Sequence, residues 1–158
     1  MRKSWLIGLA AALVGLFAFP AIASAQSGHF VTGGNNAPTC TDIGTQLSCS
    51  GKVAGLGGTE FEITLEATGT ASVDCRNPGG NVAPGQRTSV TAAGTSGPLA
   101  TPRNGRYEFT VTTATPTVPN VPTCPNPQWT AEVTDVEFDS ATLRLFEDDV
   151  LSDMFMVF

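Results

Sequence analysis

Three acidic residues alternate in the last third of the chain, Asp135, Glu137 and Asp139. Successive side chains of a β-strand point to opposite faces, so a strand here would project all three carboxylates from one face. Hard cations take oxygen ligands, and a further acidic run at 147–149 follows nearby in sequence. The pattern makes these three residues a calcium candidate, although no DxDxDG-type loop accompanies them.

A cross-strand pairing is the simpler interpretation of the same residues, and we favour it. A two-residue hairpin turn at Asp139–Ser140 would place Asp135 opposite Arg144 and Glu137 opposite Thr142. Such pairs are ordinary on a solvated sheet face. We therefore expect no metal and no other cofactor.

Catalytic side chains are scarce. Nucleophilic catalysis usually needs His or Lys beside Ser or Cys. His29 is the only histidine, Lys52 is the only lysine after the first few residues, and neither lies in a recognisable motif. A glycosidase would need two carboxylates, and the many acids on strand faces single out no pair. We expect a non-enzymatic protein; a secreted hydrolase is the less favoured alternative.

The four cysteines predict two disulfides, because an even number in an exported chain is the usual sign of them. They are Cys40, Cys49, Cys75 and Cys124. Zinc is the competing interpretation, but there is no CxxC pair. Cys40 and Cys49 flank a predicted hairpin at Asp42–Thr45, and Cys75 and Cys124 each adjoin a predicted strand end. We expect the pairs Cys40–Cys49 and Cys75–Cys124, with the other pairings open.

Two loops rich in Gly, Pro and Asn, at 77–86 and 114–128, would meet if Cys75 bonds to Cys124. Loops at one end of a rigid sandwich are common binding surfaces. A turn loop with no binding role is the alternative. Trp129 is expected in the core, since it begins an alternating strand. The candidate binding residues, suited to a sugar or a peptide, are Arg76, Asn77, Asn81, Gln86, Asn120, Asn126 and Gln128.

The N-terminus has the order of a secretory signal. Arg2 and Lys3 precede an apolar run from Trp5 to Phe19, Pro20 ends it, and Ala23–Ala25 supplies small residues for cleavage. A membrane anchor would need ~20 apolar residues. We expect a signal peptide at 1–25 cleaved after Ala25, a secreted or extracytoplasmic location, and one mature domain at 26–158 without a transmembrane span.

Charge restricts the partners. Removal of Arg2 and Lys3 with the leader takes the formal net charge from −6 to −8. The remaining arginines are scattered, whereas nucleic acid is held by clustered Lys and Arg. We expect no nucleic acid, and a cell-wall or extracellular polysaccharide or another protein as partner.

Period-2 alternation predicts strands, most clearly at Glu60–Ala67 and Arg106–Thr112. Trp129 to Val133 and Val136 to Phe138 have opposite parity, which a β-bulge near Thr134 would explain. Seven or eight short strands separated by Gly/Pro turns predict an all-β fold, an antiparallel β-sandwich of immunoglobulin-like, Greek-key type. The weaker strands are expected at 29–33, 46–55, 70–76, 87–93 and 141–146.

The last segment, 147–158, fits both a helical stripe and a strand, and we favour the strand. Its end, 154–158, is uncharged and apolar. We expect an ordinary last strand of the sandwich. The alternative is a strand that completes a neighbouring subunit's sheet, making the protein a self-assembling surface or filament subunit.

Three segments resemble a group of small, uncharacterised exported bacterial proteins: CSGKVAGLGG at 49–58, NPGGNVAPGQ at 77–86 and CPNPQWTAEVTDVEF at 124–138. The likeness covers most of the chain after the leader. It implies export and a β-rich fold. It brings no catalytic or binding residue with it.

Overall fold

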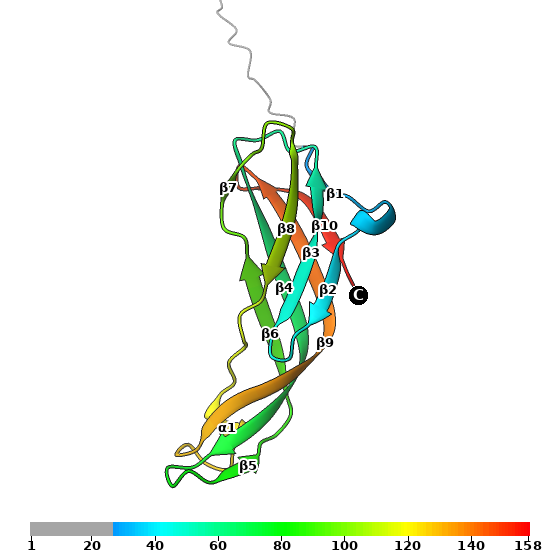
Figure 1. The fold of residues 1–158 in the computed structure, drawn as a ribbon. Coiled ribbons are helices and arrows are strands. Elements are labelled where there is room, and N and C mark those ends of the chain that lie inside the picture. The colour runs from blue at the N-terminus through cyan, green and yellow to red at the C-terminus, as the bar shows by residue number, and fades with distance from the viewer. Residues whose placement is uncertain (1–26) are drawn as a thin grey trace, which may run out of the picture.

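The computed structural model describes residues 27–158, so the signal peptide expected at 1–25 lies outside the described residues. Nearly all regular structure in this part is β (Figure 1). The elements are β1 (His29–Phe30), the 3-10 helix η1 (Gly34–Asn36), β2 (Thr39–Asp42), β3 (Leu47–Ala54), β4 (Glu60–Arg76), β5 (Val82–Pro84), β6 (Thr88–Thr95), β7 (Leu99–Ala100), β8 (Arg106–Thr112), α1 (Asn120–Thr123), β9 (Thr130–Glu147) and β10 (Val150–Met156).

Two antiparallel sheets pack as a sandwich. In the smaller sheet β3 pairs with β8 on one side and with β1 and β2 on the other. In the larger sheet the order is β10-β9-β4, and β7, β6 and β5 follow one another along the far side of β4. The predicted all-β sandwich is confirmed. The described chain has ten strands rather than seven or eight, because short edge strands such as β5 and β7 carry no alternation that a sequence pattern could reveal.

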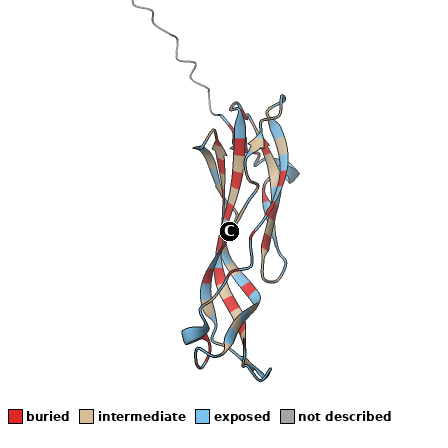
Figure 2. Cartoon of the chain, turned by 90° about the vertical axis from the view of Figure 1, so that its left-hand side faces the viewer, coloured by how far each residue is buried: buried red, intermediate tan, exposed pale blue. Residues whose placement is uncertain are grey.

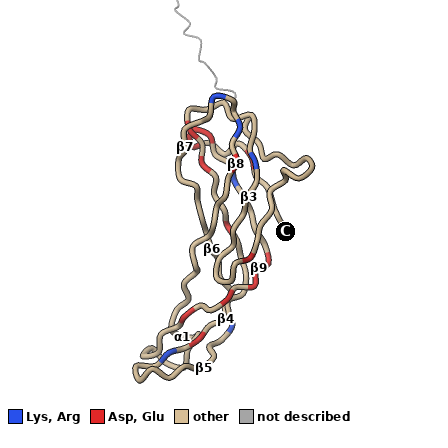
Figure 3. The backbone as a smooth tube through the Cα atoms, viewed as in Figure 1, with Lys and Arg blue, Asp and Glu red and all other residues tan. Residues whose placement is uncertain are grey.

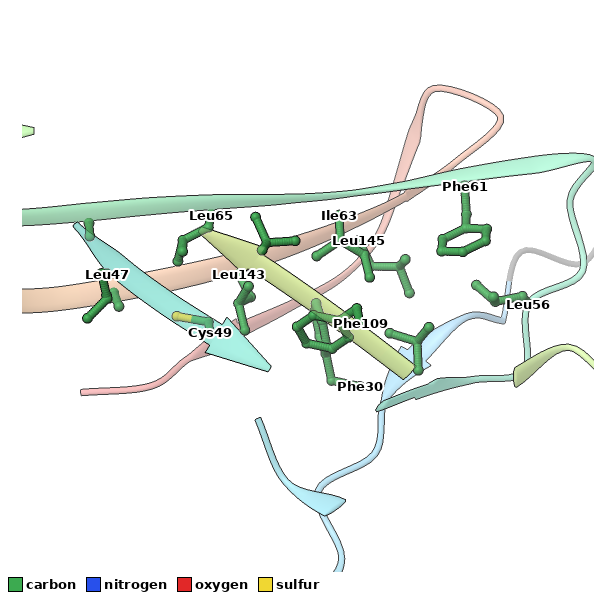
Figure 4. Close-up of a cluster of buried hydrophobic side chains, with 14 residues drawn as sticks. Phe30, Leu47, Cys49, Leu56, Phe61, Ile63, Leu65, Phe109, Leu143 and Leu145 are labelled. Atoms are coloured by element: carbon green, nitrogen blue, oxygen red, sulfur yellow. The ribbon is translucent and has the colours of Figure 1, made fainter. Parts of the chain in front are cut away.

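The main core fills the space between the sheets (Figure 4). Alternate residues of β4, such as Phe61, Ile63 and Leu65, are almost fully buried, as the alternation predicted. Leu143 and Leu145 of β9 are equally buried beside them. Apolar burial on this scale stabilises the fold by roughly 25 cal/mol per Å² removed from water. The period of two therefore decides which face of each strand lies inward.

β4 and β9 are single long strands paired along their whole lengths. The predicted turn at Asp139–Ser140 is wrong, because Asp139 is instead an extra residue in β9, between the pairs Thr68↔Ser140 and Gly69↔Phe138. A Cβ on Gly69 would overlap the carbonyl oxygen of Glu137, so glycine is required opposite this bulge. The bulge shifts the register of β9 against β4 by one residue, and the pairing continues beyond it.

The other bulge in β9 was predicted correctly. Ser72 pairs with Asp135 and Val73 with Val133, which leaves Thr134 as the extra residue. The parity change puts Val133 and Val136 against the same small apolar cluster. A β-bulge therefore explains the one-residue slip in the sequence pattern.

The actual turn before the last strand is formed by Asp148 and Asp149, both with positive φ (46° and 65°). Positive φ at both central residues is typical of the two-residue type I′ hairpin, and Asp tolerates it better than most residues. Glu147 pairs with Val150 across this turn. The C-terminal segment is a strand, as we favoured.

Both predicted disulfides are present. Cys40 and Cys49 lie opposite each other on β2 and β3, with Cα atoms 4.0 Å apart. Cys75, near the end of β4, bonds to Cys124, just after α1, with Cα atoms 5.7 Å apart. The chain between Cys40 and Cys49 forms the expected hairpin, closed by the Ile43 N–H donating to the Gln46 carbonyl at 3.0 Å.

Candidate functional site

β4 and β9 run beyond the smaller sheet and carry an extension, which we call the arm (Figures 1 and 2). The arm contains residues 71–76 of β4, β5, residues 114–129 including α1, and residues 130–138 of β9. A second apolar cluster stiffens it, with Ala71, Val73, Val90 and Val136 buried. Val90 of this cluster comes from β6, and Phe138 packs against both this cluster and the main core, so the apolar packing of the arm continues that of the sandwich.

The tip of the arm is held together covalently. Cys75–Cys124 joins the end of β4 to the segment after α1. Beside it, the Gln86 N–H donates to the Thr123 carbonyl at 2.9 Å. A Cβ on Gly85 would lie 2.9 Å from the Cys75 sulfur, so the loop backbone packs directly on the disulfide. The loops at 77–86 and 114–128 therefore do meet at one end of the molecule.

Three of the candidate asparagines hold the loops themselves. Oδ1 of Asn77 accepts the Asn81 N–H at 2.9 Å, Oδ1 of Asn126 accepts the Gln128 N–H at 3.1 Å, and Oδ1 of Asn120 accepts the Ala131 N–H at 2.9 Å. The bond of Asn126, to an N–H two residues on, is the short-range turn that Asn commonly makes, and that of Asn77 closes a loop of four residues. These amides set the loop shape.

Among the candidate residues that do not shape a loop, Arg76, Asn81, Gln86 and Gln128 are exposed at the tip. Arg76 lies 3.8 Å from Glu132, an exposed ion pair of little energetic weight. Trp129, expected in the core, is half-buried just before β9, and its backbone N–H donates to the Asn126 carbonyl at 3.2 Å. The tip thus presents amides and one arginine on a fixed frame, together with the exposed apolar side chains of Val82 and Val121.

The calcium candidates lie along β9, and all three are exposed. Glu137 pairs with Arg87 at 2.6 Å, and Asp135 lies opposite Ser72, not Arg144 as predicted. The acidic run 147–149 is at the far end of β9, roughly 25 Å from Asp139 at ~3.3 Å per residue. Among residues 27–158, no three His, Cys, Asp or Glu side chains are grouped to hold a metal ion. Figure 3 shows the charges dispersed over the molecule.

The structure also places the two candidate catalytic side chains, His29 and Lys52. His29 is exposed, with Nδ1 3.0 Å from the Ser27 carbonyl. Lys52 pairs with Glu108 at 2.9 Å, and this hydrogen bond and charge lower the pKa of Glu108. Lys52 and Glu108 line a shallow hollow of about 340 Å³ on the outer face of the smaller sheet, whose rim includes Asn35 and Asn36 of η1; His29 does not line it. The hollow is polar and open, as expected of a solvated sheet face.

Sequence reasoning missed a buried carboxylate, Glu147. It is completely buried at the end of the sandwich opposite the arm. It accepts hydrogen bonds from the N–H groups of Gly28, Gly57 and Gly58 and from the Ser152 hydroxyl, at 2.7–3.3 Å. Burial raises the pKa of Glu147. The hydrogen bonds from Gly57, Ser152, Gly28 and Gly58 together lower it by more than burial raises it, so the pKa is below the ordinary value. The only sequence signal was an acid at an inward position of an alternating strand.

No protein-family model matches the chain, and no curated protein matches it in sequence. A comparison with solved structures finds a calcium-binding mutant (D341A D367A) of Bacteroides uniformis beta-glucuronidase 2, at 14% identity and a TM-score of 0.33. The match covers 82% of this chain but only 14% of that enzyme. No helix among residues 27–158 is long and apolar enough to cross a membrane.

Proposed function

We propose that the protein is an exported, non-enzymatic binding module that contacts its partner with the tip of the arm. The observation that carries this proposal is the Cys75–Cys124 disulfide, which fixes two loops against each other at the end of an extension with its own small apolar cluster. A preorganised loop pair loses little conformational entropy on binding. Loops on a rigid scaffold are where sandwich proteins commonly bind.

A polysaccharide of the cell envelope is the partner class we assign to this surface. The exposed side chains Asn81, Gln86 and Gln128 offer amide donors and acceptors without net charge, which suits sugar hydroxyls. Arg76 adds a donor fork beside them. Another exported protein is the alternative partner.

Export and the secretory leader belong to the same proposal. Two disulfides in a chain of this size support an oxidising compartment. The order of the strands also supports an immunoglobulin-like topology. The chain crosses from one sheet to the other between β3 and β4 and between β8 and β9, and β9 lies between β4 and β10.

The test compares retention on isolated cell-wall polysaccharide. A triple variant, Asn81→Ala with Gln86→Ala and Gln128→Ala, removes exposed amides and leaves the loop-shaping asparagines intact. We expect retention to fall at least about tenfold, corresponding to about 1.4 kcal/mol of binding free energy, with unchanged melting. The matched control is Asn35→Ala with Asn36→Ala, exposed amides on η1. Equal retention of wild type and triple variant would refute the tip as the contact surface.

A further inference from the structure

Two arginines at the end of the sandwich opposite the arm have no acidic partner. Four of the described cations lie 2.6–3.8 Å from a glutamate carboxylate: Lys52, Arg76, Arg87 and Arg144. Arg103 and Arg106 are the only other lysine or arginine residues between positions 27 and 158, and neither forms such an ion pair. Both are exposed. In a chain with 14 acids against eight bases, two unpaired cations this close in sequence leave a local positive charge.

A tight turn fixes both arginines. The turn Pro102–Gly105 is closed by a 2.8 Å hydrogen bond from the N–H of its last residue to the carbonyl of its first. Arg103 and Asn104 are its central residues, and Arg106 follows as the first residue of β8. The glycine has a φ of 61°, and its carbonyl accepts the Leu56 N–H at 3.1 Å, so the turn is tied to the β3–β4 loop. The three polar side chains therefore start from a fixed backbone.

A second hollow lies beside Arg106 on the outer face of the smaller sheet. Arg106 pairs across the sheet with Ala54, whose small side chain leaves space, and the next outward pair is Lys52 with Glu108. The hollow has a volume of about 230 Å³, and Arg106, Asn104, Lys52 and Glu108 are among the residues that line it. The positive charge of Arg106 therefore faces a recess that a small group can enter.

Hydrogen-bond donors dominate the free polar groups at this hollow. Oδ1 of Asn104 accepts the Arg106 backbone N–H at 3.2 Å, which leaves the NH₂ of the amide to bind elsewhere. A guanidinium has five N–H donors and no acceptor. The one acid, Glu108, is neutralised by Lys52 at 2.9 Å. Donors with a net positive charge suit a group that only accepts, and a carboxylate matches the fork of an arginine with two parallel hydrogen bonds.

We propose that this hollow binds the carboxylate of an acidic sugar unit, a uronic acid, in a polysaccharide of the cell envelope. The Arg106 guanidinium and the Asn104 amide donate to the carboxylate, and Arg103 adds its charge beside them. The second carboxylate oxygen of Glu108 accepts from a neighbouring sugar hydroxyl. The partner class rests on the proposed function, but the site lies on the sandwich and does not use the tip of the arm.

The net charge of the chain selects this kind of anion. Because the chain is acidic overall, a densely charged partner such as nucleic acid or an anionic membrane surface meets repulsion over most of the molecule. A carboxylate on an otherwise neutral sugar chain brings its charge only to the positive hollow. A concave site with a few placed polar groups also suits a small unit such as a single sugar.

Titration calorimetry with oligomers of galacturonate and of glucuronate tests the site on the chain secreted with its own leader. At least one oligomer should bind at least about tenfold more tightly than its methyl ester, which keeps the hydroxyls and loses the charge. Added salt should weaken the binding of the acid form. Arg106→Gln should lower this affinity at least about tenfold with unchanged melting. Asn104→Asp should do the same, because it keeps the oxygen that accepts the Arg106 N–H and replaces the donor by a negative charge.

Two arginine variants serve as controls. Arg87→Gln removes the same charge from an exposed arginine that is already paired with Glu137, and it should leave the affinity unchanged. Arg76→Gln separates the two surfaces, because Arg76 lies at the tip of the arm. Affinity lost in Arg76→Gln and kept in Arg106→Gln would move the acidic sugar to the tip and overturn this inference while the proposed function stands. Equal binding of acid and ester, or no binding of either oligomer, would also overturn it.

Discussion

Oε2 of Glu147 accepts the backbone N–H of Gly28 at 2.8 Å, so the last residue of β9 fixes the segment that leads into β1. Only glycine fits at position 28, because the Cβ of any other residue would lie 2.6 Å from that oxygen. The other carboxylate oxygen accepts the Gly57 N–H at 2.7 Å. One buried charge thus joins the N-terminal segment, the β3–β4 loop and the C-terminal hairpin.

Glu147→Ala should lower the free energy of unfolding by about 2–4 kcal/mol, because it leaves buried N–H groups without an acceptor. Glu147→Gln should cost less, since it keeps one acceptor oxygen and the volume. Urea denaturation measures both. The control is Glu60→Ala, an exposed acid. Equal stability of Glu147→Ala and Glu60→Ala would contradict this role.

Stability should also depend on pH through Glu147. The pKa of Glu147 is lower in the folded than in the unfolded protein. Its contribution to the free energy of unfolding is therefore complete above the pKa of an unfolded Glu, about 4.3, and is lost as pH falls through the folded pKa. The pKa of Asp148 is lowered as well, by hydrogen bonds from the Thr59 hydroxyl and from the Glu60 and Thr59 N–H groups. Urea midpoints between about pH 6 and pH 3 should fall in the wild type and fall less in Glu147→Gln. Parallel curves for the two proteins would contradict the assignment to Glu147.

The two disulfides should differ in their effect on stability. On the chain-entropy model, loss of Cys75–Cys124 costs up to about 4 kcal/mol and loss of Cys40–Cys49 up to about 2.7 kcal/mol, because the first closes the longer loop. Paired Cys→Ser variants compared by thermal melting check this order. Hydrogen exchange should rise at 114–129 only in the variant lacking Cys75–Cys124. Exchange unchanged there would mean that the disulfide does not hold the tip.

Gly69→Ala should destabilise the protein by about 1–3 kcal/mol, since its Cβ meets the backbone of Glu137 and Phe138 at the bulge. Gly33→Ala is the matched control: nothing lies within 4 Å of its Cβ and its φ of −87° suits alanine. The control should be neutral or slightly stabilising. Equal denaturant midpoints for the two variants would contradict this prediction and would show that the β9 backbone shifts at the bulge to accommodate the added Cβ.

The disulfide pairs and the meeting of the two loops followed from local patterns. Cys40 and Cys49 flank a short hairpin, and Cys75 and Cys124 adjoin strand ends, so the predicted strand layout favoured these pairings. The bulge at Thr134 was likewise visible as a change of parity. The sequence could not show that Asn77 and Asn126 would be used to shape their own loops.

The sequence by itself determined which side chains turn inward, because burial of alternate residues is a local property of each strand. Only the tertiary structure decided where β9 continues and where it turns. Asp139–Ser140 and Asp148–Asp149 are both plausible turns locally, and pairing with the full length of β4 selects the second. The tertiary structure also decided that Glu147 is buried and hydrogen-bonded, since its donors include Gly28 and Gly57, far away along the chain.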